Sequence, residues 1–344
     1  MRTERTCLTV ALVIALAWSL GAAEPKEPAQ PPAPTPARNP AGPAPAPAEP
    51  APAVAAAKEL GEPVDQEFKA ALDGSMQKYV EMLPKGFDSK KPHDLLIALH
   101  GHGSDRWQYV KQDRSECKGV RAVAAQHEMI FISPDYRAAT SWMGPKAEAD
   151  VVQLIGLLKA RYKTRKVILC GASMGGTSVL IFSALHPDLV DGVLSSNGTA
   201  NMVEYENFQA AIIASYGGTK AEKPEEYRNR SPELAPKRFT MPIAFTVGGK
   251  DTSVPPDSVR RLAARLKELG KKDFLMIDRE TGGHSTSYED TVAGLEFVLK
   301  AIDEAERDKA KTPAGRPKKA AVPPKKTEPA KSDVPKTGDT PPSP

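Results

Sequence analysis

The chain has 344 residues and 33 prolines, twelve of them in residues 24–57 and nine in residues 313–344, so the foldable part is the proline-poor stretch 58–307. A stretch of that length makes one domain with a sizeable buried interior, which excludes a disulfide-stapled miniprotein. Outside a basic tail that starts at Asp308, the chain carries 38 basic and 39 acidic residues, so its net charge of +4 gives no warrant for a nucleic-acid partner.

Residues 1–23 have the layout of a secretory signal peptide. Arg2 and Arg5 form a basic start, residues 7–20 are apolar, and small residues follow at 21–23. The apolar run is shorter than the roughly 20 residues that a membrane-spanning helix needs, although a retained anchor stays open as the alternative. We therefore expect an exported protein that is secreted, periplasmic or associated with the cell envelope.

The two terminal segments beyond the signal are predicted to be disordered. Residues 24–57 are rich in proline and alanine and form a linker, because proline continues neither a helix nor a sheet ladder. The Pro/Lys-rich tail 308–344 is a solvated linker in one interpretation. In the other, its positive charge contacts an anionic envelope or polysaccharide.

The core alternates short apolar runs with longer stretches of helical periodicity. Strands are predicted at 77–83, 94–99, 129–133, 167–170, 190–195, 243–247 and 274–277. Helices are predicted at 115–127, 146–162, 175–185, 257–269 and 288–304. This alternation indicates an α/β fold with a mostly parallel sheet and helices on both faces.

Polar or glycine-rich turns follow four of these strands, where parallel sheets bind their ligands. The turns are His100–Gly103, Gly171–Gly176, Gly248–Asp251 and the loop that holds Gly282–His284. We expect all four to meet at one edge of the sheet.

Gly171-Ala-Ser173-Met-Gly175 fits the pattern G-x-S-x-G between a strand and a helix. Such a turn is too tight for larger residues at the glycine positions, and it exposes the serine hydroxyl at the start of the helix. Ser173 is therefore the predicted nucleophile.

A serine hydroxyl needs a base, and the base needs an acid that fixes its tautomer. Asp251 and His284 follow Ser173 in the order Ser, Asp, His, and each comes after its own strand. We assign His284 as the base that takes the proton of Ser173 and Asp251 as the acid that orients it.

The predicted oxyanion hole consists of two backbone N–H groups, those of His102 and Met174. His102 lies between glycines that let the backbone approach a substrate closely, and Met174 follows the nucleophile. His100 and His102 also suggest a metal pair, but the next ligands of an H-x-H-x-D-H hydrolase are missing, since position 104 is Ser and Asp105 is followed by Arg106. No metal and no cofactor are expected.

On these residues the core resembles the α/β-hydrolase superfamily of serine hydrolases over residues 75–301. Residues 79–86, before the Leu-His-Gly-His-Gly run, are similar to polyhydroxybutyrate-depolymerase-like and feruloyl-esterase-like enzymes. Residues 227–232, followed by 242–251, resemble prolyl-oligopeptidase-like hydrolases. The resemblance implies Ser173, Asp251 and His284 as the catalytic triad. Full prolyl oligopeptidases carry a β-propeller, for which residues 57–86 leave no room.

Aromatic residues in the loops are candidates for the substrate pocket. They are Trp107, Tyr136 and Trp142, and packing of the loops onto the sheet is the alternative role. The insertion 197–241 carries Tyr205, Phe208 and Tyr216, which either cap the site or fasten the insertion to the core.

Three functions remain open. The first is an exported serine carboxylesterase that cleaves small or carbohydrate-linked esters through an acyl-enzyme. It is the simpler expectation because the leaving group of an ester needs less protonation than that of an amide. The second is a serine peptidase that acts on short peptides, and the third is a non-catalytic envelope-binding protein. Cys117 and Cys170 remain after removal of the signal; we expect Cys170 to be a buried small hydrophobe, with a disulfide between them as the alternative.

Overall fold

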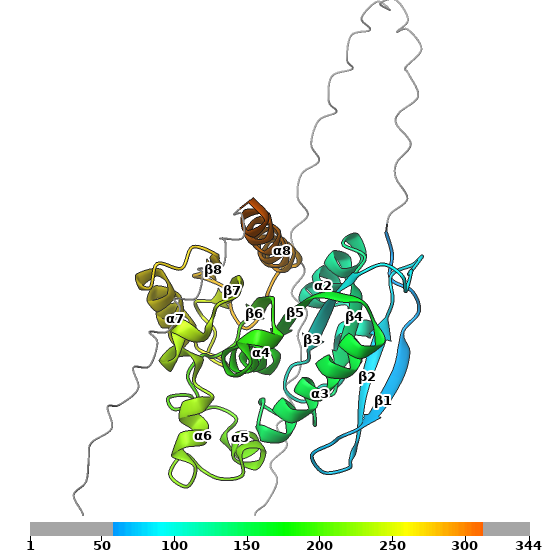
Figure 1. The fold of residues 1–344 in the computed structure, drawn as a ribbon. Helices are drawn as coiled ribbons and strands as arrows, with labels where there is room; N and C mark the ends of the chain where they lie inside the picture. The colour runs from blue at the N-terminus through cyan, green and yellow to red at the C-terminus, as the bar shows by residue number, and fades with distance from the viewer. Residues whose placement is uncertain (1–57, 312–344) are drawn as a thin grey trace, which may run out of the picture. The chain divides into compact units, whose positions relative to one another are not determined.

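The computed structural model describes residues 58–311, whose centre is one eight-stranded sheet (Figure 1). The strands follow the order β1-β2-β4-β3-β5-β6-β7-β8; β1 and β2 are antiparallel to their neighbours, and the other neighbouring pairs are parallel. The strands are β1 (Val64–Lys69), β2 (Met76–Met82), β3 (His93–Leu99), β4 (Ile130–Pro134), β5 (Thr164–Ala172), β6 (Gly192–Ser196), β7 (Ile243–Gly248) and β8 (Phe274–Arg279).

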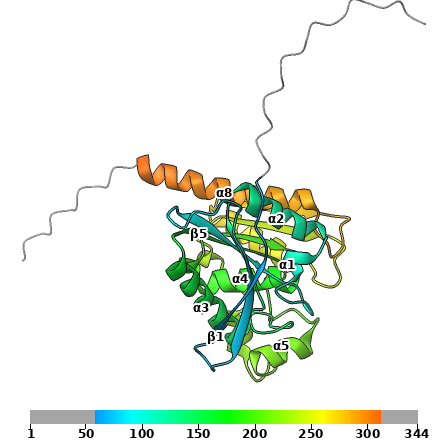
Figure 2. The same cartoon turned by 90° about the vertical axis from the view of Figure 1, so that its right-hand side faces the viewer.

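Helices cover both faces of this sheet, as Figure 2 shows for α2 and α8 on one side and α3 and α4 on the other. The α-helices are α1 (Gln108–Lys111), α2 (Ser115–Gln126), α3 (Pro145–Arg161), α4 (Met174–Leu185), α5 (Gln209–Tyr216), α6 (Pro224–Asn229), α7 (Asp257–Glu268) and α8 (Tyr288–Lys311). Three short 3₁₀ turns are η1 (Pro187–Leu189), η2 (Pro232–Leu234) and η3 (Pro236–Arg238). The predicted architecture is therefore confirmed.

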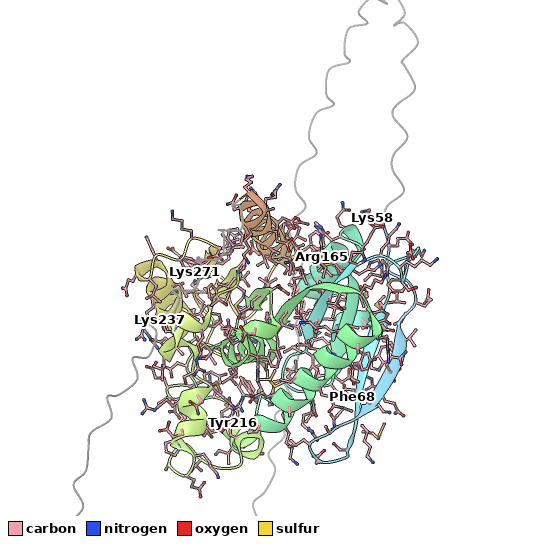
Figure 3. The ribbon with its side chains drawn as sticks, in the orientation of Figure 1. Lys58, Phe68, Arg165, Tyr216, Lys237 and Lys271 are labelled. Atoms are coloured by element: carbon pink, nitrogen blue, oxygen red, sulfur yellow. The ribbon has the colours of Figure 1, made fainter. Side chains whose placement is uncertain are left out.

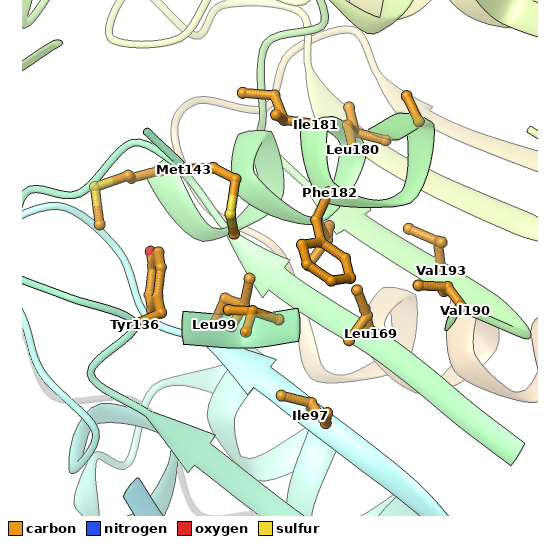
Figure 4. Close-up of a cluster of buried hydrophobic side chains, with 14 of the residues drawn as sticks. Ile97, Leu99, Tyr136, Met143, Leu169, Leu180, Ile181, Phe182, Val190 and Val193 are labelled. Carbon is orange, nitrogen blue, oxygen red and sulfur yellow. The ribbon is translucent and has the colours of Figure 1, made fainter. Parts of the chain in front are cut away.

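Two separate apolar layers hold the helices against the sheet. The first joins α3, α4 and α7 to one face, and Figure 4 shows Phe182 of α4 directed at Leu169 of β5 within it. The second joins α2 and α8 to the other face. Helix α4 is buried along its length, because it lies between the sheet and the insertion and carries apolar residues on all sides. The nucleophile turn therefore sits on the most enclosed helix of the domain.

The seven predicted strands and five predicted helices are present, with ends that differ by a few residues. Strand β1 was not predicted, because it is an exposed edge strand of mainly polar residues in which only Gln66 and Phe68 are partly buried, and Phe68 packs on the core (Figure 3). The short helices α1, α5 and α6 were also missed. Helix α8 runs to Lys311, four residues into the tail predicted from Asp308, and an Asp308–Lys311 ion pair spans its last turn.

Both core cysteines, Cys117 and Cys170, are buried and free of a disulfide. Burial raises the pKa of the Cys117 thiol to about 12 and that of Cys170 further still. Each behaves as the small hydrophobe that was expected for Cys170. Within residues 58–311, no helix has the length and apolarity to cross a membrane. The predicted signal peptide, the linker and the tail beyond residue 311 lie outside the described residues.

Candidate active site

Ser173 lies in the sharp turn between β5 and α4. Its backbone has φ 60° and ψ −123°, which is unusual for a residue with a side chain, and its N–H donates to Ser196 O at 2.9 Å. The flanking glycines are required by space: a Cβ on Gly175 would lie 1.9 Å from Leu99 O, and one on Gly171 would lie 2.5 Å from the carbonyl carbon of Gly175. The strained turn holds the serine hydroxyl above the end of the sheet.

His284 and Asp251 reach Ser173 from the loops after β8 and β7. His284 Nε2 lies 2.8 Å from Ser173 Oγ, and His284 Nδ1 lies 2.6 Å from Asp251 Oδ2. With the carboxylate as acceptor, Nδ1 carries the proton and Nε2 is left to accept the hydrogen of the serine. The three predicted residues therefore form one continuous hydrogen-bonded row.

The carboxylate of Asp251 is buried and fully engaged. Its Oδ1 accepts the N–H groups of Ser253 and Val254, both at 2.9 Å. Its Oδ2 faces His284, so the side chain has little freedom to turn away from the imidazole. A fixed acid is what holds one tautomer of the base.

Asn197 is a residue of this site that the sequence analysis did not single out. It follows β6 with φ 48°, and its Nδ2 lies 3.5 Å from Asp251 Oδ2 and 3.4 Å from Gly283 O. Its Oδ1 accepts the hydroxyl of Thr286, which in turn bonds Thr246. Asn197 thereby links the acid to the loop that carries the base. An asparagine two residues after the predicted strand 190–195 was the available signal.

The backbone around His102 leaves one N–H free in the predicted oxyanion turn. Gly101 N–H donates to Gln108 Oε1 at 2.9 Å and Gly103 N–H to Ala139 O at 2.7 Å. The N–H groups of His102 and of Met174, the first residue of α4, have no acceptor within residues 58–311. These are the two donors predicted for the oxyanion hole.

His100 serves the structure of this turn. Its ring is buried, with Nδ1 2.9 Å from Gly101 O and Nε2 3.2 Å from Asp135 O, and burial lowers its pKa. The part of the chain that the structure describes contains no cluster of three or more histidine, cysteine or acidic side chains arranged to hold a metal.

A cavity of about 380 Å³ opens at Ser173 and His284. The polar side chains in its wall include Ser104, Gln112, Arg114 and Ser253, and Phe208 is its large apolar side chain. It contains no carboxylate, because Asp251 is screened behind His284. Such a wall suits a substrate that offers oxygen atoms to hydrogen-bond donors.

The predicted pocket residues Trp107, Tyr136 and Trp142 do not line this cavity. Trp142 is fully buried and donates from Nε1 to His102 Nδ1 at 3.0 Å, and Tyr136 is buried with its hydroxyl on His100 O at 2.6 Å. Trp107 faces Lys111, whose Nζ lies 3.8 Å from the ring centroid. The prediction failed because loop direction depends on tertiary packing that periodicity does not encode.

The aromatic residues of the insertion divide between the two roles considered. Phe208 is 40% exposed and lines the cavity, as a cap residue would. Tyr205 and Tyr216 are buried and bond backbone carbonyls of Ser253 and Trp142, so they fasten the insertion to the core. Figure 3 labels Tyr216 in this region.

The sheet topology and the serine, histidine and aspartate at its edge define the class: the chain is a serine hydrolase with the α/β-hydrolase fold. Its residues 136–302 match the prolyl oligopeptidase family. No curated protein sequence matches the chain.

Solved structures of several serine hydrolases share this fold at low sequence identity. The acylaminoacyl peptidase of Pyrococcus horikoshii has a TM-score of 0.56 and 16% identity, with 72% of this chain and 42% of the peptidase covered. The S-formylglutathione hydrolase of Staphylococcus aureus has a TM-score of 0.54 and 15% identity, with 70% and 98% covered. A ferulic acid esterase of Anaeromyces mucronatus has a TM-score of 0.52 and 14% identity, with 71% and 92% covered. The chain thus spans less than half of the peptidase and nearly all of the other two enzymes.

Proposed function

We propose that this protein is a serine carboxylesterase that cleaves small or carbohydrate-linked esters through an acyl-enzyme. The observation that carries the proposal is the row Ser173–His284–Asp251, with spacings of 2.8 and 2.6 Å. In this mechanism His284 takes the proton of Ser173 as Oγ attacks the ester carbonyl. The N–H groups of His102 and Met174 receive the charge that develops on the carbonyl oxygen.

The second half of the reaction uses the same groups. His284 returns its proton to the departing alkoxide, which leaves the acyl group on Ser173. A water molecule, deprotonated by His284, then attacks the acyl carbon, and the proton passes back to Ser173 as the acid is released. Asp251 stabilises the imidazolium that forms in each step without taking the proton itself.

The cavity favours an ester with a polar alcohol. Gln112, Arg114, Ser104 and Ser253 supply hydrogen-bond donors around the nucleophile, which match the hydroxyl and ether oxygens of a sugar. An ester also needs less protonation of its leaving group than an amide. A serine peptidase acting on short peptides is the second candidate, favoured by the match of residues 136–302 to the prolyl oligopeptidase family.

The test compares kcat/KM of the purified protein on a small aryl ester and on the matching aryl amide. Ser173→Ala should lower ester turnover by several orders of magnitude, which leaves only binding and oxyanion contributions. Ser183→Ala is the matched control, because its hydroxyl lies on the same helix and is buried without a hydrogen-bond partner within the described residues.

The outcomes separate the candidates. Strong ester turnover that depends on Ser173, with negligible amide turnover, supports the esterase. Comparable amide turnover replaces it with the peptidase. No turnover, together with no labelling of Ser173 by an activated phosphonate, leaves the non-catalytic envelope-binding alternative.

We also propose that the protein is exported, on the sequence layout of residues 1–23, and that its basic tail contacts an anionic envelope polymer. Mass spectrometry of the mature N-terminus tests export, since cleavage near Ala23 is expected. Cosedimentation with cell-wall polysaccharide at low and high salt tests the tail, because screening should release an electrostatic contact.

A further inference from the structure

The loop 135–144, between β4 and α3, makes several contacts to the turn that carries the oxyanion donor. Ala139 O accepts Gly103 N–H, the hydroxyl of Tyr136 donates to His100 O, and Trp142 Nε1 donates to His102 Nδ1. Every residue of the turn except Gly101 is therefore fastened to this one loop.

The same loop is strained at both ends. Tyr136 and Arg137 have φ of 31° and 87°, and Trp142 and Met143 have φ of 42° and 53°, in the region that favours glycine. Strain of this kind persists only where the surroundings impose it, and it gathers at functional sites. Arg230, itself buried, donates to Met143 O and holds the second strained pair in place.

The Trp142–His102 bond determines where the imidazole proton lies. An indole N–H can only donate, so Nδ1 of His102 must offer its lone pair and the proton must be on Nε2. Nε2 has no acceptor within residues 58–311, and His102 lines the cavity at Ser173. An N–H donor is therefore left available on a ring that lines the cavity.

The surroundings of the ring keep it in this form. Trp142 and Phe208 both pack against it, with ring centroids 5.8 and 4.6 Å from that of His102 and 5.4 Å from each other. This desolvation lowers the pKa of His102, which favours the neutral imidazole. A neutral ring with one fixed tautomer is a directional donor rather than a titrating charge.

We propose that Trp142 is a positioning residue that fixes His102 as the Nε2–H tautomer, so that the His102 side chain donates a hydrogen bond to an oxygen atom of the bound ester. The role in substrate binding rests on the proposed esterase function. The tautomer does not, because it follows from the indole contact alone. Substrates with an acceptor oxygen at this position are therefore expected to bind better than analogues that carry a methylene there.

The first test is ¹⁵N NMR of the imidazole nitrogens in the unmodified protein at pH 7.5. We expect a protonated Nε2 and an unprotonated Nδ1 for His102, and the same pattern in Ser173→Ala. A protonated Nδ1, or rapid exchange between tautomers, would overturn the proposal whether or not the protein hydrolyses esters.

The second test is kinetic and uses a rescue variant. Trp142→Phe should mix the two tautomers in the NMR spectrum and lower kcat/KM for the aryl ester about tenfold, the effect of one lost hydrogen bond. His102→Gln keeps an Nε2–H donor that cannot tautomerise, so Trp142→Phe should cost at most about twofold in that background. Trp107→Phe is the matched control, since its ring lies outside the cavity.

Two kinetic results would count against the proposal. One is an equal loss from Trp142→Phe with His102 and with Gln at position 102, which would mean that the indole acts through packing alone. The other is an equal loss from Trp107→Phe. If Trp142→Phe does not fold, the comparison of His102→Gln, expected to retain kcat/KM within about threefold, with His102→Leu, expected to lose about tenfold, tests the same donor.

Discussion

Asn197 holds its side-chain amide 3.5 Å from Asp251 Oδ2, although the two residues follow different strands. The same amide lies 3.4 Å from Gly283 O, next to the base. Asp251 and the loop that carries His284 therefore both contact Asn197, in addition to contacting each other. The hydroxyl of Thr286 occupies the amide oxygen and so directs the amide N–H groups toward them.

Asn197→Ala should lower kcat for the aryl ester about tenfold while changing KM little. A hydrogen bond to a charged group contributes about 1.5–3 kcal/mol, and these long contacts place Asn197 at the low end. Asn201→Ala is the control, because this buried asparagine bonds Glu233 instead of the triad. The assignment fails if both variants lose kcat equally, which steady-state kinetics with a melting curve for each variant would show.

Phe208→Ala should raise KM for aryl esters roughly fivefold and leave kcat nearly unchanged. The ring covers His102 at the cavity wall, and its removal takes away apolar contact with the substrate worth about 1 kcal/mol. Leu234→Ala, at a similarly exposed apolar residue of the insertion outside the cavity wall, should leave both constants unchanged. A fall in kcat alone for Phe208→Ala would instead show that the ring orients the oxyanion turn.

Asp150 makes stability depend on pH in an unusual direction. Burial raises its pKa to about 6, against the opposing effect of Arg137, so its charged form is disfavoured in the folded protein. The contribution of Asp150 to the free energy of unfolding is fully present below the pKa of about 4 in the unfolded chain, and it is lost as pH rises through 6. Relative to Asp150→Asn, the wild type should lose up to about 3 kcal/mol of unfolding free energy between pH 4 and pH 7.

Chemical denaturation at several pH values measures this loss. Asp290 supplies a control of opposite sign, because the hydrogen bond from Arg279 lowers its pKa. Its contribution is present above pH 4 and is lost as pH falls below that value, so the gap between wild type and Asp290→Asn should not shrink from pH 4 to pH 7. A gap between wild type and Asp150→Asn that stays constant over this range would contradict the expected shift.

Gly175→Ala should destabilise the fold by several kcal/mol, since its Cβ would collide with the backbone oxygen of Leu99 at 1.9 Å. Gly156→Ala is the matched control within a helix. A Cβ there has no atom within 4 Å, so the substitution should stabilise the protein by about 0.5–1 kcal/mol. Thermal unfolding of the two variants should therefore move in opposite directions, and a tolerated Gly175→Ala would mean that the turn is looser than its contacts indicate.

The sequence predicted the sheet, most helices and the residues that meet at Ser173, because turn chemistry and the order of strands are local or topological signals. The residues of the cavity wall could not be predicted from the sequence. Gln112 and Arg114 line the cavity from the end of the short helix α1 and the residues after it, and the placement of this segment depends on the packing of α1 against α2. Trp142 turned inward for a similar reason: its environment is set by the insertion, whose short helices carry little periodicity.

The burial of α4 on all sides means that the serine hydroxyl is carried by an element that cannot fray without opening the whole domain. Its amide hydrogens should exchange with solvent only through global unfolding. Heat inactivation should consequently follow the unfolding of the entire core, with no earlier stage in which the fold persists and the nucleophile is lost. Residual activity after heating then measures the fraction of protein that is still folded.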